Sequence, residues 1–226
     1  MPVYNPYIDK INIEEVKRYA GLDNCNEFPE KMLKEACLKG KTLIAPKAIW
    51  HMYPYDSVLN KIMSPVPVYL NSNSITAHLE GAIEVAVFAV TIGVELEEEV
   101  SNMFIQGNYT EAILLDAVGS CVTEQAVEQL VSMLAHQAAR NGHIIGRRYS
   151  PGYGDWPISA QKDIVEISHA DIIGIKLTTA MMLVPRKSVT AIIGLYPYQN
   201  ALSMPSMQEE VCESCNHIIC QYKKSR

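Results

Sequence analysis

The feature that most constrains the fold is a long stretch of helical periodicity between residues 110 and 141. Apolar side chains recur there every three or four residues, as they do on one face of an amphipathic helix. These side chains are Ile113, Leu114, Ala117, Cys121, Ala126, Leu130 and Leu134. The pair Gly107-Asn108 interrupts the chain before this stretch, and Gly142 stands at its end. The pattern therefore predicts one helix from about Thr110 to Asn141.

Four stretches have the composition of β-strands. Residues 83–92 are apolar and rich in β-branched side chains, which predicts a buried strand. Residues 66–70 and 189–195 are predicted as further strands. Residues 42–49 also look extended, but Pro46 has no amide hydrogen to donate. This last stretch is therefore predicted to be an edge strand at best.

Two helices are expected before the first buried strand. Asn12 is suited to cap a helix over residues 12–20, with Glu15 at the capping-box position. A second helix is predicted over residues 29–39, because it begins at a proline and Gly40 follows in the C′ position. Both predictions depend on terminal signals and not on a strong apolar period.

The remaining pattern gives the fold class. A helix is predicted over residues 95–105, a loop over 143–157, and a helix capped by Ser159 over 159–167. Strands occur in clusters and do not alternate regularly with helices, which favours an α+β fold with helices packed on a mostly antiparallel, twisted sheet. We expect a single domain over residues 1–210 and a Cys-rich tail over 211–226.

Composition excludes several classes of protein. Hydrophobic residues make up 48% of the 226 residues and charged residues 19%, which is typical of a globular chain. The net charge is −6, and no basic face is evident, so nucleic-acid binding is not expected. No apolar run reaches the roughly 18 residues of a membrane span. The N-terminus does not resemble a signal peptide, so a cytoplasmic protein with reduced cysteines is expected.

Residues 147–157 concentrate side chains that are unusual in a simple connection. Two prolines fix the backbone, and two glycines permit positive φ and close approach of another group. Arg148 offers a planar fork of donors suited to a carboxylate, and Tyr153 and Trp156 supply flat apolar surfaces. A rigid turn held by buried aromatic rings is the alternative explanation. The composition alone leaves a binding loop and a structural turn equally open.

Two segments resemble one known family. The sequence Arg148-x-x-Pro151-Gly152-Tyr153, followed by Pro157, resembles the R-x-x-x-G-Y segment of the activation domain of cobalamin-dependent methionine synthase. About thirty residues later, residues 178–191 (TTAMMLVPRKSVTA) are similar to the family's T-x-x-x-A-M-x-P-x-x-S-V-S-G region. The order and spacing agree, and the long helix before them fits as well. The resemblance covers about residues 110–195 and implies an activation-domain-like fold.

The resemblance implies a binding site for S-adenosylmethionine. Arg148 would hold the carboxylate of the ligand, and Ser150 and Tyr153 would present main-chain groups to the methionine or adenine part of the ligand. Pro151 belongs to the same segment, and Gly152 would keep the approach open. The sequence departs from the family at residues 154–156 and 191–194, so contacts to adenine are not assigned.

Glu124 and Glu128 lie one helical turn apart on the predicted long helix. An α-amino carboxylate needs an acceptor near its ammonium group, so these two side chains are candidates for that role. Surface charges on an amphipathic helix are the alternative reading. The acidic run at residues 95–99 is read as a solvated helix N-terminus, and Met181 and Met182 are read as core residues.

The implied function is the reductive reactivation of a corrinoid enzyme. The domain would bind S-adenosylmethionine and place its methyl group over the cobalt of cobalamin, a proximity effect. The chain is too short to hold its own cobalamin module, so we expect it to act in trans on a cobalamin-binding methionine synthase or another corrinoid protein. A flavodoxin or ferredoxin would supply the electron. Two alternatives are an S-adenosylmethionine-dependent methyltransferase for a small molecule and a non-catalytic structural partner of a corrinoid enzyme.

The last residues contain a possible metal site. Cys212, Cys215 and Cys220 are spaced so that thiolates can share one ion, and His217 lies between them. Zinc or an iron-sulfur centre would suit these ligands, whereas ordinary thiols are the alternative. The other histidines show no ligand spacing, and no catalytic residue is assigned, because no order of nucleophile, base and acid is apparent.

Overall fold

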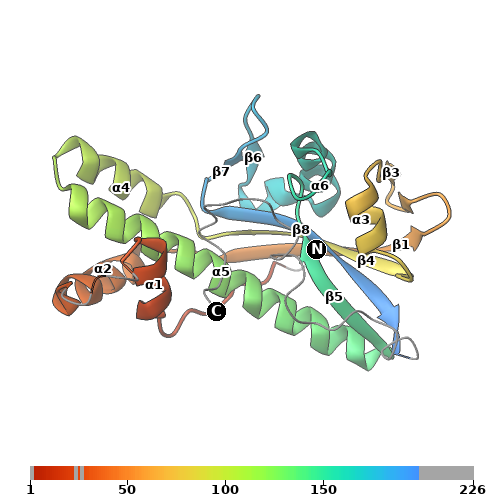
Figure 1. Ribbon diagram of the computed structural model, residues 1–226, viewed down its shortest axis with the longest axis horizontal. Coiled ribbons are helices and arrows are strands. Elements are labelled where there is room, and N and C mark those ends of the chain that lie inside the picture. Colours follow the sequence, from red (N-terminus) through yellow and green to blue (C-terminus); the bar gives the residue numbers. More distant parts are fainter. Residues whose placement is uncertain (1–2, 23–24, 26–27, 199–226) are drawn as a thin grey trace.

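The computed structural model describes residues 3–22, 25 and 28–198 of the chain. A six-stranded sheet has the order β3-β2-β1-β4-β8-β5, and all neighbouring strands are antiparallel. Its strands are β1 (Lys47–Asp56), β2 (Lys61–Ile62), β3 (Val68–Tyr69), β4 (Glu84–Thr91), β5 (His143–Tyr149) and β8 (Ser188–Pro197). A separate hairpin consists of β6 (Lys176–Leu177) and β7 (Leu183–Val184), and it projects from the body of the protein (Figure 1).

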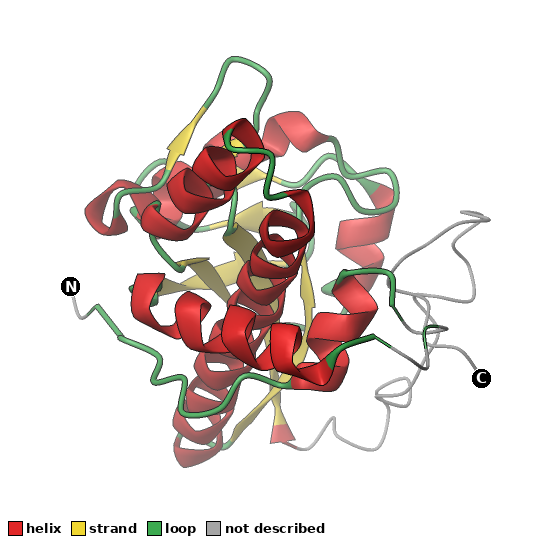
Figure 2. Ribbon diagram, turned by 90° about the vertical axis from the view of Figure 1, so that its left-hand side faces the viewer, coloured by secondary structure: helices red, strands yellow, loops and turns green. Residues whose placement is uncertain are grey.

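Helices cover both faces of this sheet (Figure 2). They are α1 (Ile13–Tyr19), α2 (Glu30–Leu43), α3 (Asn73–His78), α4 (Glu95–Ile105), α5 (Tyr109–Arg140) and α6 (Gln161–Ser168), with short 3-10 turns at Ile158–Ala160 and Ala170–Ile173. Helices α1, α2 and α4 gather around the long α5 on one face, whereas α3 and α6 lie on the other (Figure 1). The predicted α+β class with a mostly antiparallel sheet is confirmed.

Strand β4 shows why the sheet needs two helical layers. Its side chains alternate between the faces, as strand geometry requires. Ala86, Phe88 and Val90 pack into the cluster formed with α5, while Val85 and Val87 pack into the cluster formed with α3 and α6. Both sets are fully buried. A continuous apolar run, as predicted for residues 83–92, therefore corresponds to a central strand covered on both sides.

Helix α2 extends past the glycine that was expected to end it. Gly40 lies inside the helix, and a Cβ atom placed on it would come 2.4 Å from Cγ1 of Val118 on α5. The glycine is required by the close packing of two helices and not by a left-handed C′ turn. The prediction of a helix end at residue 39 was therefore wrong. By contrast, Gly142 follows α5 with a φ of +72°, as expected for a stop signal.

Strand β1 begins at Lys47, later than the predicted extended stretch of residues 42–49, because α2 continues to Leu43. It lies between β4 and β2 in the sheet order, with Lys47–Pro54 paired to β4 and only Tyr55 and Asp56 paired to β2. Among the described residues, positions 47–49 therefore have β4 on one side and only the bridge from Tyr4 to Ala48 on the other. Pro46 precedes the strand, so its missing donor does not interrupt the ladder. Pro54 lies within the strand, and its carbonyl accepts a hydrogen bond from the amide of Met63 over 2.9 Å. The prolines are accommodated at positions where no amide hydrogen is needed.

Two further local predictions were wrong. Residues 143–149 form strand β5 at the edge of the sheet and are not part of a loop, because they pair with β8 around an irregularity between Ile145 and Arg148. Ser159 lies in a 3-10 turn, and the residue that precedes α6 is Ala160, without a side-chain cap. The short α3, which Ser72 caps through a bond from the amide of Ile75, was not predicted.

The expected boundary between residues 210 and 211 lies outside the described residues, so the division into a domain and a tail stays a prediction. Within the part of the chain that is described, none of the helices has the length and apolar character needed to cross a membrane.

Candidate functional site

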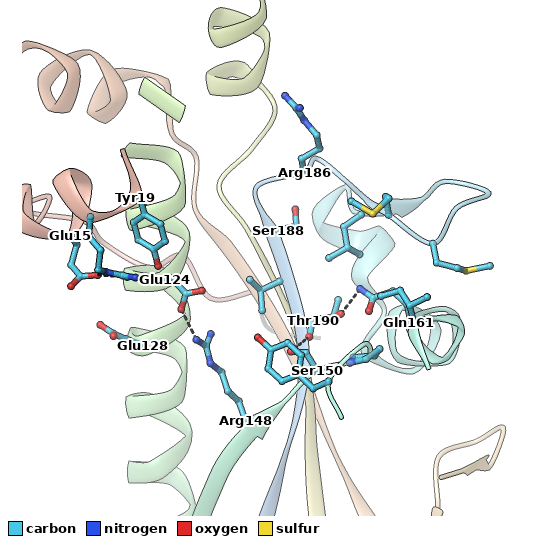
Figure 3. Close-up of a pocket in the computed structure, with 18 residues that line it drawn as sticks. Glu15, Tyr19, Glu124, Glu128, Arg148, Ser150, Gln161, Arg186, Ser188 and Thr190 are labelled. Atoms are coloured by element: carbon cyan, nitrogen blue, oxygen red, sulfur yellow. Dashed lines mark hydrogen bonds and ion pairs between the residues drawn. The ribbon is translucent and has the colours of Figure 1, made fainter. Parts of the chain in front are cut away.

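A pocket of about 690 Å³ lies where the two family-like segments meet the helical layer. Helices α1 and α5 line one side of it (Figure 3). Strand β5 with its following loop, strand β8, the start of α6 and the β6–β7 hairpin line the rest. Pockets of this size are common for small-molecule ligands. The topology therefore brings residues 15–19, 124–128, 148–161 and 181–190 together at one place.

The charged end of the pocket lies between the helices and β5. Arg148 donates from Nη2 to Oε2 of Glu124 over 2.6 Å, and each side chain is about one third exposed. Glu128 lies one turn further along α5 and also lines the pocket (Figure 3). On α1, Glu15 accepts from Nη2 of Arg18 over 2.6 Å. Carboxylates from two helices thus lie beside two guanidinium groups.

The loop after β5 forms a compact turn through its own main chain. The amide of Gly152 donates to the carbonyl of Trp156, and the amide of Tyr153 donates to the carbonyl of Ser150. Oγ of Ser150 donates to the carbonyl of Thr190 on β8. Ser150 and Tyr153 line the pocket, but their mutual hydrogen bond leaves the Tyr153 amide engaged within the turn.

Pro151 also lines the pocket and is itself buried, whereas Gly152 is not among the lining residues. Gly152 has a φ of +95°, a conformation that glycine adopts without strain. The requirement for glycine there comes from the turn. The roles that the family resemblance implied for this segment stay predictions, since no ligand is present.

Asp155 fastens the far end of the loop to helix α3. Its carboxylate accepts hydrogen bonds from Oγ of Ser72 over 2.5 Å and from the amides of Asn73 and Ser74, each over 2.9 Å. The hydrogen bonds from the serine hydroxyls and from these amides hold the pKa of the Asp155 carboxyl well below its usual range. Gly154 beside it has a φ of +54°.

The other end of the pocket is apolar with a few polar groups. Met181, Met182 and Leu183 of the hairpin line it, together with Ile158 and Val189. Met182 is 57% exposed and Met181 is half-buried, so the expectation that the two methionines belong to the core was wrong. They lie on a projecting hairpin whose strands are only two residues long, and such a hairpin has little interior of its own.

Gln161 and Thr190 add a buried polar pair to this end. Nε2 of Gln161 donates to Oγ1 of Thr190 over 2.6 Å, and both residues line the pocket. Gln161 is the first residue of α6, which explains how a polar side chain reaches the floor of the pocket from that helix.

The acidic run of α4 is only partly solvated. Glu97 is buried and accepts from the amide of Lys187 over 2.5 Å, and its other carboxylate oxygen lies 3.5 Å from Nε of Arg186. Nζ of Lys187 lies 2.9 Å from Oδ2 of Asp116 on α5. The reading of this run as a solvated helix N-terminus was therefore wrong for Glu97, whose carboxylate fixes the start of β8 beside the pocket.

The predicted metal ligands Cys212, Cys215 and Cys220 lie outside the described residues. Within residues 3–22, 25 and 28–198, no group of three or more His, Cys, Asp or Glu side chains is arranged to hold a metal ion. The zinc or iron-sulfur centre expected at the tail stays a prediction.

Sequence reasoning missed the contribution of helix α1 to the pocket. Glu15, Arg18 and Tyr19 line it, and the guanidinium of Arg18 lies 4.3 Å from the centroid of the Tyr19 ring. Their spacing by three and four residues places them on one face of a helix, which was the available signal. Their nearness to α5 depends on long-range packing, which a local pattern does not reveal.

Comparison with known proteins finds one family model and one solved structure that are similar to this chain. The family model described as vitamin B12 dependent methionine synthase, activation domain, matches residues 75–216. Among solved structures, the chain is similar to the MetH reactivation domain bound to AdoHcy, with 15% sequence identity and a TM-score of 0.62. The similarity covers 87% of this chain and 78% of that one. At this level of identity, the likeness establishes the shared fold.

Proposed function

Because the chain belongs to the family of vitamin B12 dependent methionine synthase activation domains, we propose that it binds S-adenosylmethionine in the pocket beside Arg148 and presents the methyl group to cobalamin held by a partner protein. The observation that carries the proposal is the meeting of Arg148, Glu124 and Glu128 at one end of a 690 Å³ pocket formed by both family-like segments.

The charged end suits the amino-acid part of the ligand. An α-amino carboxylate needs a cation beside its carboxylate and an anion beside its ammonium group. Arg148 carries five N–H donors, and its bond to Glu124 uses Nη2, so the fork has further donors that a ligand carboxylate can accept from. Glu124, Glu128 and Glu15 supply the negative charges that attract an ammonium and a sulfonium group.

The apolar end suits the nucleoside part. Met181, Met182 and Ile158 offer contact surface for a flat ring, and methionine adapts its shape to such a surface. Gln161 and Thr190 add hydrogen-bonding groups at the floor. The pocket thus divides into a charged half and an apolar half, as S-adenosylmethionine does.

The chemistry of methyl transfer belongs to the cofactor of the partner. Cobalamin supplies a reduced cobalt nucleophile that accepts the methyl group once an external donor has delivered an electron. The residues of this chain hold and orient the sulfonium methyl, and S-adenosylhomocysteine leaves as the product. In this proposal the partner is a cobalamin-binding methionine synthase or another corrinoid protein, and the donor is a flavodoxin or a ferredoxin.

Binding is tested first, by titrating the purified chain with S-adenosylmethionine in a calorimeter. The chain is then mixed with labelled S-adenosylmethionine, a low-potential reductant and a corrinoid protein that carries oxidised cobalt. We expect methylcobalamin to form, seen by its absorbance, and no turnover without the corrinoid protein. Methylation of a small molecule without corrinoid would favour an ordinary methyltransferase, and the absence of binding would favour a structural partner.

A further inference from the structure

We propose that helix α3 acts as a brace for the pocket. It holds the pocket-forming segment of residues 147–155 in position, because both ends of that segment are hydrogen-bonded to the helix or its N-cap. The proposal deepens the proposed function and rests on it, since it concerns how the same site is held in shape. Asp155 and His78 are its positioning residues.

The first fastening is at the N-terminal end of α3. Ser72 Oγ and the amides of Asn73 and Ser74 all donate to the carboxylate of Asp155. In return, the amide of Asp155 donates to Oγ of Ser74 over 3.3 Å. Four hydrogen bonds thus join one residue of the loop to three consecutive residues of another element, and bonds to an ionised carboxylate are stronger than neutral ones.

The second fastening is at the C-terminal end of the same helix. The ring of His78 contacts the carbonyl oxygen of Arg147 through Nε2 over 2.8 Å and lies 4.8 Å from the ring of Tyr149. Burial lowers the pKa of His78, and the neutral ring is suited to donate from Nε2 to that carbonyl. Arg147 immediately precedes Arg148, so this bond adds to the pairing of Arg148 with Ile193 of β8 in holding the backbone from which the pocket guanidinium extends.

The brace is itself anchored to the core. Ile75 and Leu79 are fully buried in the cluster that also contains Tyr149 and Trp156. The hydroxyl of Tyr196 on β8 donates to the carbonyl of His78 over 2.8 Å. Since the helix is tied to the sheet, the segment tied to the helix has a fixed position relative to β8.

The segment between the two fastenings carries the pocket residues. Arg148, Ser150, Pro151 and Tyr153 line the pocket, whereas Asp155 and His78 do not. Loss of either fastening should therefore displace pocket residues that the substituted side chain never contacts.

The variant Asp155→Asn removes the charge with little change of shape. Asp56→Asn is the matched control, because Asp56 accepts from the amides of Val58 and Leu59 at a turn whose residues do not line the pocket. His78→Phe removes the donor and keeps an aromatic ring, and Ser72→Ala is a milder variant if Asp155→Asn is poorly folded. Two measurements are made on each protein: the Kd for S-adenosylmethionine, and hydrogen exchange of the amides of residues 147–157 without ligand.

We expect Asp155→Asn and His78→Phe each to raise the Kd about three- to tenfold, and the double variant to raise it more than tenfold. Hydrogen exchange in residues 147–157 should be faster in Asp155→Asn and in His78→Phe. Asp56→Asn should change neither the Kd nor the exchange rate. Unchanged exchange in Asp155→Asn and His78→Phe would overturn the brace, and faster exchange with an unchanged Kd would overturn its role in binding. If the wild-type chain binds no S-adenosylmethionine, the proposed function fails, and the exchange rates alone decide whether the brace exists.

Discussion

Residues 147–155 and the β6–β7 hairpin line one pocket but are held in different ways. Residues 147–155 are tied to α3 at both ends and to β8 through Ser150 and the pairing of Arg148 and Tyr149, and Tyr149 and the adjacent Trp156 are buried. The β6–β7 hairpin pairs Lys176 with Val184 and Leu177 with Leu183, and main-chain hydrogen bonds between Thr178 and residues 181–182 close its turn. Leu183 packs against a buried cluster, whereas Met182 and Val184 are exposed.

This difference in how firmly the two segments are held suggests different roles for them in the proposed site. A segment with many buried contacts opens rarely, whereas one with few buried contacts and an exposed backbone opens at low cost. The fastened segment carries Arg148, which must meet a charged group at a fixed distance and angle. The hairpin carries methionines, which tolerate changes of position. We therefore expect the charged half of the pocket to be preformed and the apolar half to adjust to the ligand.

The largest effect is expected from Gly154→Ala in the fastened segment. A Cβ atom there would lie 2.5 Å from both Oγ of Ser74 and the hydroxyl of Tyr149, and 2.8 Å from Cβ of Ser74. Left-handed strain and overpacking together cost roughly 2–4 kcal/mol. The Tm should fall by roughly 5–15 °C in a calorimetric scan, at about 2–4 °C per kcal/mol.

Gly107→Ala provides the control for this variant. Gly107 has a φ of +82°, but no atom lies within 4 Å of its added Cβ. Its substitution should cost only the conformational strain, about 1–2 kcal/mol. If the two variants lost equal stability, the contact between residue 154 and α3 would contribute nothing, and the distinction between the two segments would lose its main support.

The second effect concerns the ligand and not the fold. Arg148→Ala removes a charge-assisted hydrogen bond to the ligand carboxylate, worth about 1.5–3 kcal/mol. The Kd for S-adenosylmethionine should rise roughly 10- to 150-fold in calorimetry. Arg147→Ala is the control, since the preceding residue on the same strand does not line the pocket. An unchanged Kd in Arg148→Ala would remove this residue from the site.

Sequence patterns predicted the elements whose signals are local. The bounds of α4 were predicted without error, and α5 and β4 were predicted to within a residue or two, because each combines a clear apolar pattern with a break at its ends. Gly40 misled the prediction for α2, because its role depends on Val118 nearly eighty residues later. In the sequence, a glycine that ends a helix cannot be distinguished from one that lets a second helix pack closely against the first.

The lining of the candidate pocket was predictable where a motif is contiguous and not where packing assembles it. Arg148 and Tyr153 were identified from one short segment, and both line the pocket. Glu15 and Gln161 reach the same pocket from elements whose positions follow from the sheet order. The hydrogen bonds between Asp155 and α3 could not be predicted from the sequence either, because a six-residue helix has too few apolar positions to show a period.

The smallest effect is expected in the hairpin, from Met182→Ala. Met182 is more than half exposed, so its truncation should change the free energy of unfolding by less than about 0.5 kcal/mol. If it covers about 40 Å² of bound ligand, at about 25 cal/mol per Å² the loss is about 1 kcal/mol, or roughly a fivefold rise in the Kd. Val184→Ala is the control, because Val184 is also exposed on the hairpin but does not line the pocket. A loss of stability in Met182→Ala as large as that in Gly154→Ala would show that the hairpin is as firmly held as residues 147–155. In that case both halves of the pocket would be preformed, because a hairpin whose side chains contribute strongly to stability cannot change its position at low cost.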